Sequence, residues 1–211
     1  RLKKPEWHAF IELAKKQGKI RFSGASGHAG HLIECMDYVA DSGRFDVMLV
    51  SYNFGQDPAF YQRFTRGFDF ISRQPDLPRV LQKAKAKGVG VVAMKTLMGG
   101  RLNDMRPFEK DGATFAQAAF RWVLSNPSVD ALIISMTNPA GIDEYLGASG
   151  WKTAAQPDLP LLYRYAKLNG ASYCRQACNG CQGACPEGVP IADVLRTRMY
   201  AVDYRDMRLA R

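Results

Sequence analysis

Residues 77–101 read LPRVLQKAKAKGVGVVAMKTLMGGR, and this stretch decides the fold class. Its first half has apolar residues at the spacing of an amphipathic helix: Leu77, Val80, Leu81 and Ala84. Gly88 follows, where the end of a helix favours glycine, and the apolar run 89–95 reads as a strand. The run is continuous rather than alternating, which is typical of strands buried on both faces. The stretch therefore predicts one helix–strand unit of a parallel sheet.

The same helix–strand pattern recurs three more times within the first 150 residues. Apolar residues at helical spacing return at 7–14, 32–39 and 116–123. A short apolar strand follows each helix, at 20–25, 46–51 and 131–135. Four such units predict an α/β protein with four parallel strands and helices on the outside, which is either half of an eight-stranded barrel or a small open sheet.

Composition and charge narrow the functional classes. The chain has 211 residues, of which 46% are apolar and 23% charged, so it is long enough to bury a core and is not a disordered protein. It has no apolar run of about 18 residues, so no membrane span is expected. Its net charge of +9 is dispersed without a nucleic-acid-binding motif, so nucleic acid is not the expected partner, and an anionic ligand such as a dinucleotide is favoured.

The start of the chain bears on localisation. Nothing in it resembles a signal peptide, and we predict a cytoplasmic protein. The first residue is Arg1 rather than Met, so the chain is expected to be a fragment or a processed product, and the true N-terminus is not available for judging export.

The character of the sequence changes after Gly150, and we divide the chain into a sheet-forming region, 1–150, and a C-terminal extension, 151–211. The extension is predicted to be a small helical tail rich in cysteine. Its cysteines read C-x3-C-x2-C-x3-C-P and lie within twelve positions: Cys174, Cys178, Cys181 and Cys185.

This bunching argues for one local centre rather than a disulfide framework. Bacterial ferredoxins bind a 4Fe–4S cluster with C-x2-C-x2-C-x3-C-P, from which this run differs by one residue in the first gap. An iron–sulfur cluster is therefore favoured over a zinc site or purely structural cysteines, with Cys185 the least certain ligand. Cys35, on an apolar helix face, is predicted to be a core residue.

Polar and glycine-rich segments follow each predicted strand, where parallel α/β folds bind their ligands. Small hydroxyls, backbone amides and a fixed positive charge suit a polar anionic cofactor, with Gly99, Gly100 and Arg101 best suited to a pyrophosphate. The predicted cofactor-binding residues in these segments are Ser26, Gly27, His28, Tyr52, Met94, Lys95, Thr96, Leu97, Gly99, Gly100, Arg101, Ser135, Met136, Thr137 and Asn138.

Several of these segments together resemble a known family. GKIRFSGASGH, FDVMLVSYNF, KGVGVVAMKTLMGGRL and TFAQAAFRWVLSNPSVDALIISMTNPAGIDEYL, in this order, resemble the C-terminal half of an aldo/keto reductase. The tail YCRQACNGCQGACPEGVPI resembles the ferredoxin-like extension of one bacterial branch. The resemblance covers about residues 1–200. It implies the C-terminal half, about four βα units, of a TIM-type (β/α)8 barrel that binds NADP or NAD across its carboxyl rim.

The resemblance also implies roles for single residues. Ser26, Gly27 and His28 would contact the nicotinamide carboxamide, and Met94 occupies the place of a ring-stacking tyrosine. Residues 95–101 would line the pyrophosphate, and 135–138 with Glu144 would hold the adenosine end. Two expected carboxamide contacts are missing, because Gly27 replaces an asparagine and Leu49 a glutamine. No Lys or Arg occurs at 135–145, so a preference for NADPH over NADH is not established.

The family's catalytic Asp–Tyr–Lys–His tetrad comes from the first four barrel strands, which this chain does not match. No catalytic residue is therefore assigned. The expected activity is hydride transfer between NAD(P)H and a small-molecule carbonyl substrate in the complete barrel. The expected partner is the N-terminal half or a second copy that completes the barrel. The alternative is a non-catalytic electron-transfer or structural module stabilised by iron–sulfur or zinc.

Overall fold

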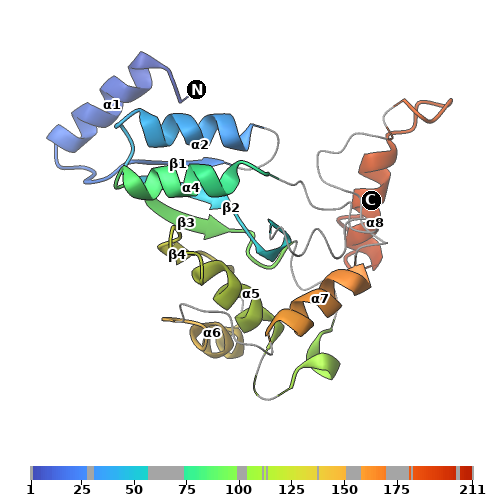
Figure 1. Ribbon diagram of the computed structural model, residues 1–211. Helices are drawn as coiled ribbons and strands as arrows, with labels where there is room; N and C mark the ends of the chain where they lie inside the picture. The colour runs from blue at the N-terminus through green and yellow to red at the C-terminus, as the bar shows by residue number, and fades with distance from the viewer. Residues whose placement is uncertain are drawn as a thin grey trace.

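Four parallel strands alternate with helices in the computed structural model of the chain (Figure 1). It describes residues 2–27, 31–56, 74–98, 104–110, 112, 114–136, 138–150, 158–169, 181, 183–202 and 205–210. The strands are β1 (Gly24–Gly27), β2 (Val47–Ser51), β3 (Gly90–Met94) and β4 (Ala131–Leu132). They form one sheet in the order β1-β2-β3-β4, and every neighbouring pair is parallel.

The helices within the sheet-forming region are α1 (Pro5–Lys16), α2 (Leu32–Asp41), α4 (Leu77–Ala86), α5 (Phe115–Leu124) and α6 (Pro139–Leu146). Two short 3-10 helices, η1 (Phe54–Gln56) and η2 (Arg106–Phe108), lie in the loops. The extension contributes α7 (Asp158–Asn169) and α8 (Ile191–Val202). The predicted alternation of helices and parallel strands is thus confirmed.

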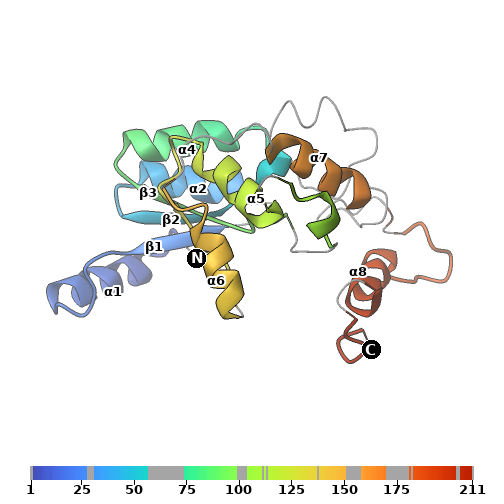
Figure 2. The ribbon, with the colours of Figure 1, turned by 90° about the horizontal axis from the view of Figure 1, so that it is seen from below.

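The two faces of the sheet differ. Helices α2, α4 and α5 lie on one side of it (Figure 2). On that side Met48, Val50, Val91 and Ala93 are completely buried. Their neighbours along β2 and β3 point to the other face and are only half-buried. The prediction that these strands are buried on both faces is therefore wrong for the described residues, and we call the second side the open face.

The first strand also begins later than predicted. It starts at Gly24 rather than Ile20, and Phe22, inside the predicted strand, is 64% exposed. Ser23 fixes the start, because its backbone N–H donates to Asp46 Oδ2 at 2.7 Å and its carbonyl accepts from the Asp46 N–H at 2.8 Å. In-register pairing with β2 then begins at Gly24 and Val47.

An ion-pair network joins the outer surfaces of α2 and α4. Arg79 donates to both carboxylate oxygens of Asp37, at 3.0 and 2.9 Å. Lys83 lies 2.8 Å from Asp37 and 2.8 Å from Asp41. The hydrogen bonds from Arg79 and then Lys83 lower the pKa of Asp37 to about 2. These contacts tie together two helices that also share the buried Leu32, Met36, Leu77 and Val80 side of the core.

Helix α7 packs on α5 rather than extending away from it. Arg121 of α5 donates to Asp158 of α7 through Nε at 2.8 Å and Nη2 at 2.5 Å. The two side chains are 7% and 0% exposed. Phe115 and Tyr165 stack beside this pair with ring centroids 4.1 Å apart. The start of the extension therefore shares a hydrophobic core with the sheet-forming region.

Candidate functional site at the carboxyl edge of the sheet

The parallel register places the ends of all four strands at one edge. Gly27, Ser51 and Met94 are the last residues of their strands, and Ser51 pairs with Met94. Ser26, one residue earlier, is in register with Leu49, which pairs with Val92. The structure thus brings three of the predicted cofactor segments, those beginning at Ser26, Met94 and Ser135, to the same edge.

Ser26 and Gly27 face opposite sides of the sheet. A Cβ atom on Gly27 would lie 2.9 Å from Met36 Cε and 3.1 Å from Leu32 Cδ1, so position 27 faces α2, and a side chain there would have to displace the tips of these two residues. Ser26 is exposed on the open face. Of this predicted pair, only Ser26 presents a side chain toward the open face.

Tyr52 lies on the helix-covered side. Its ring is buried against Trp122, with centroids 5.2 Å apart, and its hydroxyl accepts a hydrogen bond from Asn126 Nδ2 at 2.9 Å. These contacts give Tyr52 a place in the core between β2 and α5. They do not bring its ring to the open face beside Ser26 and Met94.

Asn53 organises the loop after β3, a role that the sequence analysis did not assign. Its buried side chain donates from Nδ2 to the Lys95 carbonyl at 3.1 Å and accepts from the Gly55 N–H at 3.0 Å. Lys95 also accepts from the Met98 N–H at 3.1 Å, which closes a turn. Both Lys95 and Met98 adopt the left-handed region, with φ of 58° and 56°. The turn is therefore fixed by hydrogen bonds to a neighbouring loop.

This turn separates a charged residue from buried ones. Lys95 is exposed, whereas Leu97 and Met98 enter the hydrophobic core beside Phe115. Thr96 is 0% exposed, and its Oγ1 has no hydrogen-bond partner within the described part of the chain. A buried hydroxyl without a partner costs stability, because its desolvation is not offset by a hydrogen bond.

A paired acidic residue lies in the chain after this loop. Arg106 donates to Asp104 Oδ1 through Nε at 2.8 Å and to Oδ2 through Nη2 at 2.7 Å. These side-chain hydrogen bonds, with one from the Arg106 backbone N–H, lower the pKa of Asp104 to about 2. Asp104 is therefore ionised at neutral pH, and the adjoining Arg106 offsets its charge.

The segment after β4 is more open. Ser135 and Met136 are exposed. Asn138 accepts from the Gly141 N–H at 2.8 Å and so caps the N-terminus of α6. Glu144 is half-buried on that helix, and its carbonyl accepts from Gln117 Nε2 at 2.8 Å. Asn138 thus has a helix-capping role that its position after a strand does not by itself reveal.

Five predicted cofactor residues lie outside the described residues: His28, Gly99, Gly100, Arg101 and Thr137. Two of the four predicted cluster ligands, Cys174 and Cys178, also lie outside them. Cys181 and Cys185 are half-buried free thiols. Their carbonyls accept from the N–H groups of Ala184 and Gly188, each at 3.1 Å, so each cysteine begins a turn.

Within the described ranges no group of three His, Cys, Asp or Glu side chains is arranged to hold a metal ion. Two of the four cysteines of the motif fall inside those ranges, so the predicted iron–sulfur site stays a prediction.

One further residue of this edge escaped the sequence analysis. Ser51 pairs with Met94, and it alternates with the buried Val50, so it belongs to the open face. Strict alternation of faces from Val50 would have placed Ser51 opposite to it. The apolar run before Ser51, however, does not indicate which face the helices cover.

No family model matches the chain, and no curated protein matches it significantly. Among the described residues, none of the helices is both long and apolar enough to cross a lipid bilayer.

Proposed function

We propose that this chain is the C-terminal half of a (β/α)8-barrel oxidoreductase of the aldo/keto reductase type. In the complete barrel it would bind NADP or NAD at the carboxyl edge and serve hydride transfer to or from a carbonyl compound. The observation that carries the proposal is the shared edge, at which Ser26 and Met94 lie at the ends of parallel strands and Lys95, Ser135 and Met136 follow them. When bound, the nicotinamide cofactor supplies the hydride chemistry.

The half-barrel is supported by the way the sheet is wound. Its strands follow one another in chain order, and α2, α4 and α5 share one side. A doubly wound sheet reverses direction and carries helices on both faces, whereas a barrel does neither. The open face, with Val47, Leu49 and Val92 half-buried, corresponds to a barrel interior. We propose that a further set of strands, from the N-terminal half or a second copy, covers it.

The residues after β3 fit a dinucleotide pyrophosphate. Lys95 offers an exposed ammonium group for a phosphate oxygen, whereas the Thr96 hydroxyl is enclosed by the protein. The hydrogen bonds from Asn53 and Met98 to the Lys95 carbonyl hold this turn, with Lys95 and Met98 in left-handed conformations, before a ligand arrives. At the nicotinamide end, Ser26 supplies one hydroxyl, whereas Gly27 and Leu49 supply no carboxamide contact. The fit is therefore better for the phosphates than for the nicotinamide.

Binding of the cofactor is the direct test. NADPH and NADH are titrated separately into the 211-residue chain while tryptophan fluorescence is recorded. Lys95→Gln is expected to weaken binding roughly tenfold, because it removes a charge-assisted contact. Lys87→Gln is the matched control, since Lys87 is equally exposed but precedes β3 at the opposite edge. Equal affinities of the two variants, or no quenching by either nucleotide, would contradict the proposal.

The second candidate function is a non-catalytic iron–sulfur or zinc module, and the cysteine run favours it. Cys181 and Cys185 both carry half-buried thiols at the start of tight turns. A brown protein whose visible absorption is bleached by dithionite supports a 4Fe–4S cluster, and bound zinc without colour contradicts it. Cys181→Ser is expected to abolish the absorption, whereas Cys35→Ser on α2 is expected to keep it. Colour without nucleotide binding would favour this candidate over the reductase.

A further inference from the structure

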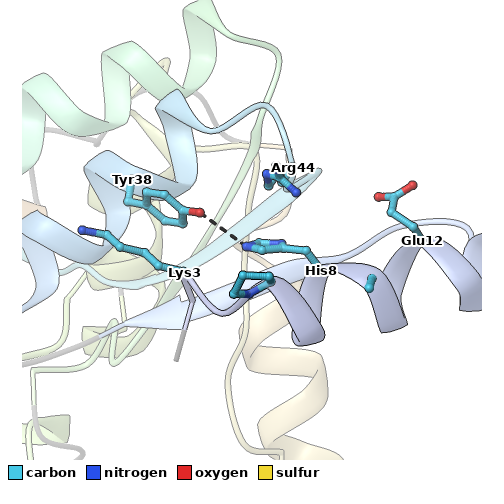
Figure 3. A pocket seen from close by; sticks show the side chains of 7 residues that line it. Lys3, His8, Glu12, Tyr38 and Arg44 are labelled. Atoms are coloured by element: carbon cyan, nitrogen blue, oxygen red, sulfur yellow. Dashed lines mark hydrogen bonds between the residues drawn. The ribbon is translucent and has the colours of Figure 1, made fainter.

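A concave site lies between α1 and the loop that precedes β2, at the amino edge of the sheet. It is a cavity of about 350 Å³, wide open to solvent, lined by Pro5, His8, Ala9 and Glu12 from α1, together with Tyr38 of α2 and Arg44 (Figure 3). Cavities of this size hold small organic ligands. The residues of the carboxyl edge take no part in it, so the site is independent of the proposed function.

The floor of this cavity is a fixed polar pair. His8 is 7% exposed and has its ring edge-on to Trp7, with centroids 5.1 Å apart, and to Phe45, at 5.9 Å. Its Nε2 lies 3.4 Å from the Tyr38 hydroxyl (Figure 3). The aromatic contacts hold the imidazole in one orientation, so the floor is preformed rather than adaptable.

Two opposite charges reach the cavity from different elements. Arg44 comes from the loop before β2 and lies over His8, and Glu12 lies further along α1, on the side of His8 away from Tyr38 (Figure 3). Among the described residues neither side chain forms an ion pair, with each other or with any third group. Lys3, the remaining charged residue of the lining, is engaged instead, 3.9 Å from Glu34 and 5.4 Å from the centroid of the Tyr38 ring.

We propose that this cavity binds a small amphoteric molecule of the apolar α-amino acid class. The guanidinium of Arg44 matches a carboxylate in two hydrogen bonds, and Glu12 accepts from an ammonium group. The apolar part lies against Pro5, Ala9 and the Tyr38 ring. Both side chains are exposed to water, so a ligand with one charge gains one of these contacts and a molecule that carries both charges gains two, which is why the pair favours the latter.

L-Phenylalanine is the probe, and the ring proton signals of His8 are followed by NMR during titration into the full chain. His8→Gln assigns these signals among the three histidines. A saturable shift with a dissociation constant on the order of 1 mM is expected for a ligand of this size. 3-Phenylpropionate, which lacks the amine, and phenethylamine, which lacks the carboxylate, are each expected to bind roughly five- to tenfold more weakly.

Variants separate the site from non-specific association. Ala9→Leu, on an exposed helical position, fills the cavity and is expected to abolish the shift while circular dichroism stays unchanged. Arg44→Gln and Glu12→Gln are expected to weaken binding. Arg21→Gln and Glu6→Gln, which lie outside the cavity, are expected to leave it unchanged. The proposal is overturned if the three ligands bind alike, if Ala9→Leu binds as the parent does, or if no shift saturates.

Discussion

The helix-covered and open faces of the sheet are formed by the same strands, but their side chains are buried to different extents. On the covered face, Met48 and Val91 are fully enclosed by α2, α4 and α5. On the open face, Leu49 and Val92, each one residue further along its strand, are only half-buried. The described chain therefore covers one face of these strands with helices and leaves the apolar side chains of the other face partly exposed.

The largest loss of stability is expected at the buried ion pair between α5 and α7, where the helix-covered side continues into the extension. Asp158→Ala removes the buried carboxylate that neutralises the charge of Arg121, so the free energy of unfolding should fall by about 3–5 kcal/mol. Urea denaturation measures it. Asp143→Asn, on the exposed part of α6, is the control and should stay within about 0.5 kcal/mol of the parent. A loss below about 1 kcal/mol for Asp158→Ala would mean that α7 is not integral to the covered side.

Neighbouring positions of β2 test the two faces directly. Met48→Ala leaves a cavity in the core and should cost about 2–5 kcal/mol. Leu49→Ala should cost less than about 1 kcal/mol, because its side chain stays partly in water. Chemical denaturation of both variants at low protein concentration gives the comparison. Equal losses would show that the open face is covered in solution, and a Leu49→Ala loss that grows with protein concentration would indicate a second copy.

Acid should reduce the stabilising contribution of the ion pairs between α2 and α4, on the outer surface of the covered side. The pKa of Asp37 is lowered from 3.8 to about 2, so its contribution is fully present above about pH 4 and is lost as the pH falls toward 2. The side chain is 29% exposed, and solvent screening leaves a loss of about 1 kcal/mol. Unfolding midpoints between pH 5 and 2 should therefore fall less steeply in Asp37→Asn. Identical slopes in parent and variant would show that Asp37 does not contribute to the pH dependence of stability.

The smallest effect concerns a hydroxyl at the carboxyl edge. Thr96→Val removes a buried group without a partner, so the unliganded protein should be unchanged or up to about 1 kcal/mol more stable. Thr114→Val, in contrast, removes the cap of α5, which accepts from the Gln117 N–H at 3.2 Å, and should cost about 1 kcal/mol. Thermal unfolding distinguishes the pair, and similar losses in both would show that Thr96 has a partner after all.

Sequence patterns predicted the units of this fold better than their orientation. The α4–β3 unit follows from the periodicity of Leu77, Val80, Leu81 and Ala84 and from the break at Gly88, because helix spacing is set by local geometry. The start of β1 did not follow, because apolar Ile20 and Phe22 look like strand residues. Hydrogen bonds between Ser23 and the distant Asp46 set the true start.

The candidate site was predicted in outline for a similar reason. Residues after parallel strands share an edge, so Ser26, Met94 and Ser135 could be found from the strand positions alone. Which side of the sheet a residue faces depends on where the helices pack, and a continuous apolar run does not indicate which side that is. Gly27 and Tyr52 were therefore predicted as ligand contacts although they face α2 and α5. The hydrogen bond from Asn53 to Lys95 joins residues that are 42 positions apart, so no local sequence pattern predicts it.

The close approach of Gly27 to Met36 and Leu32 sets a rule for how natural variants of this protein can diverge. A residue with a side chain at position 27 would displace the tips of Met36 and Leu32, so a change in the strand favours a shorter neighbour on the helix. Among descendants of this sequence, asparagine at 27 should therefore arrive with a smaller amino acid at 36 or 32. Compared across many genomes, those three positions should be inherited as a set.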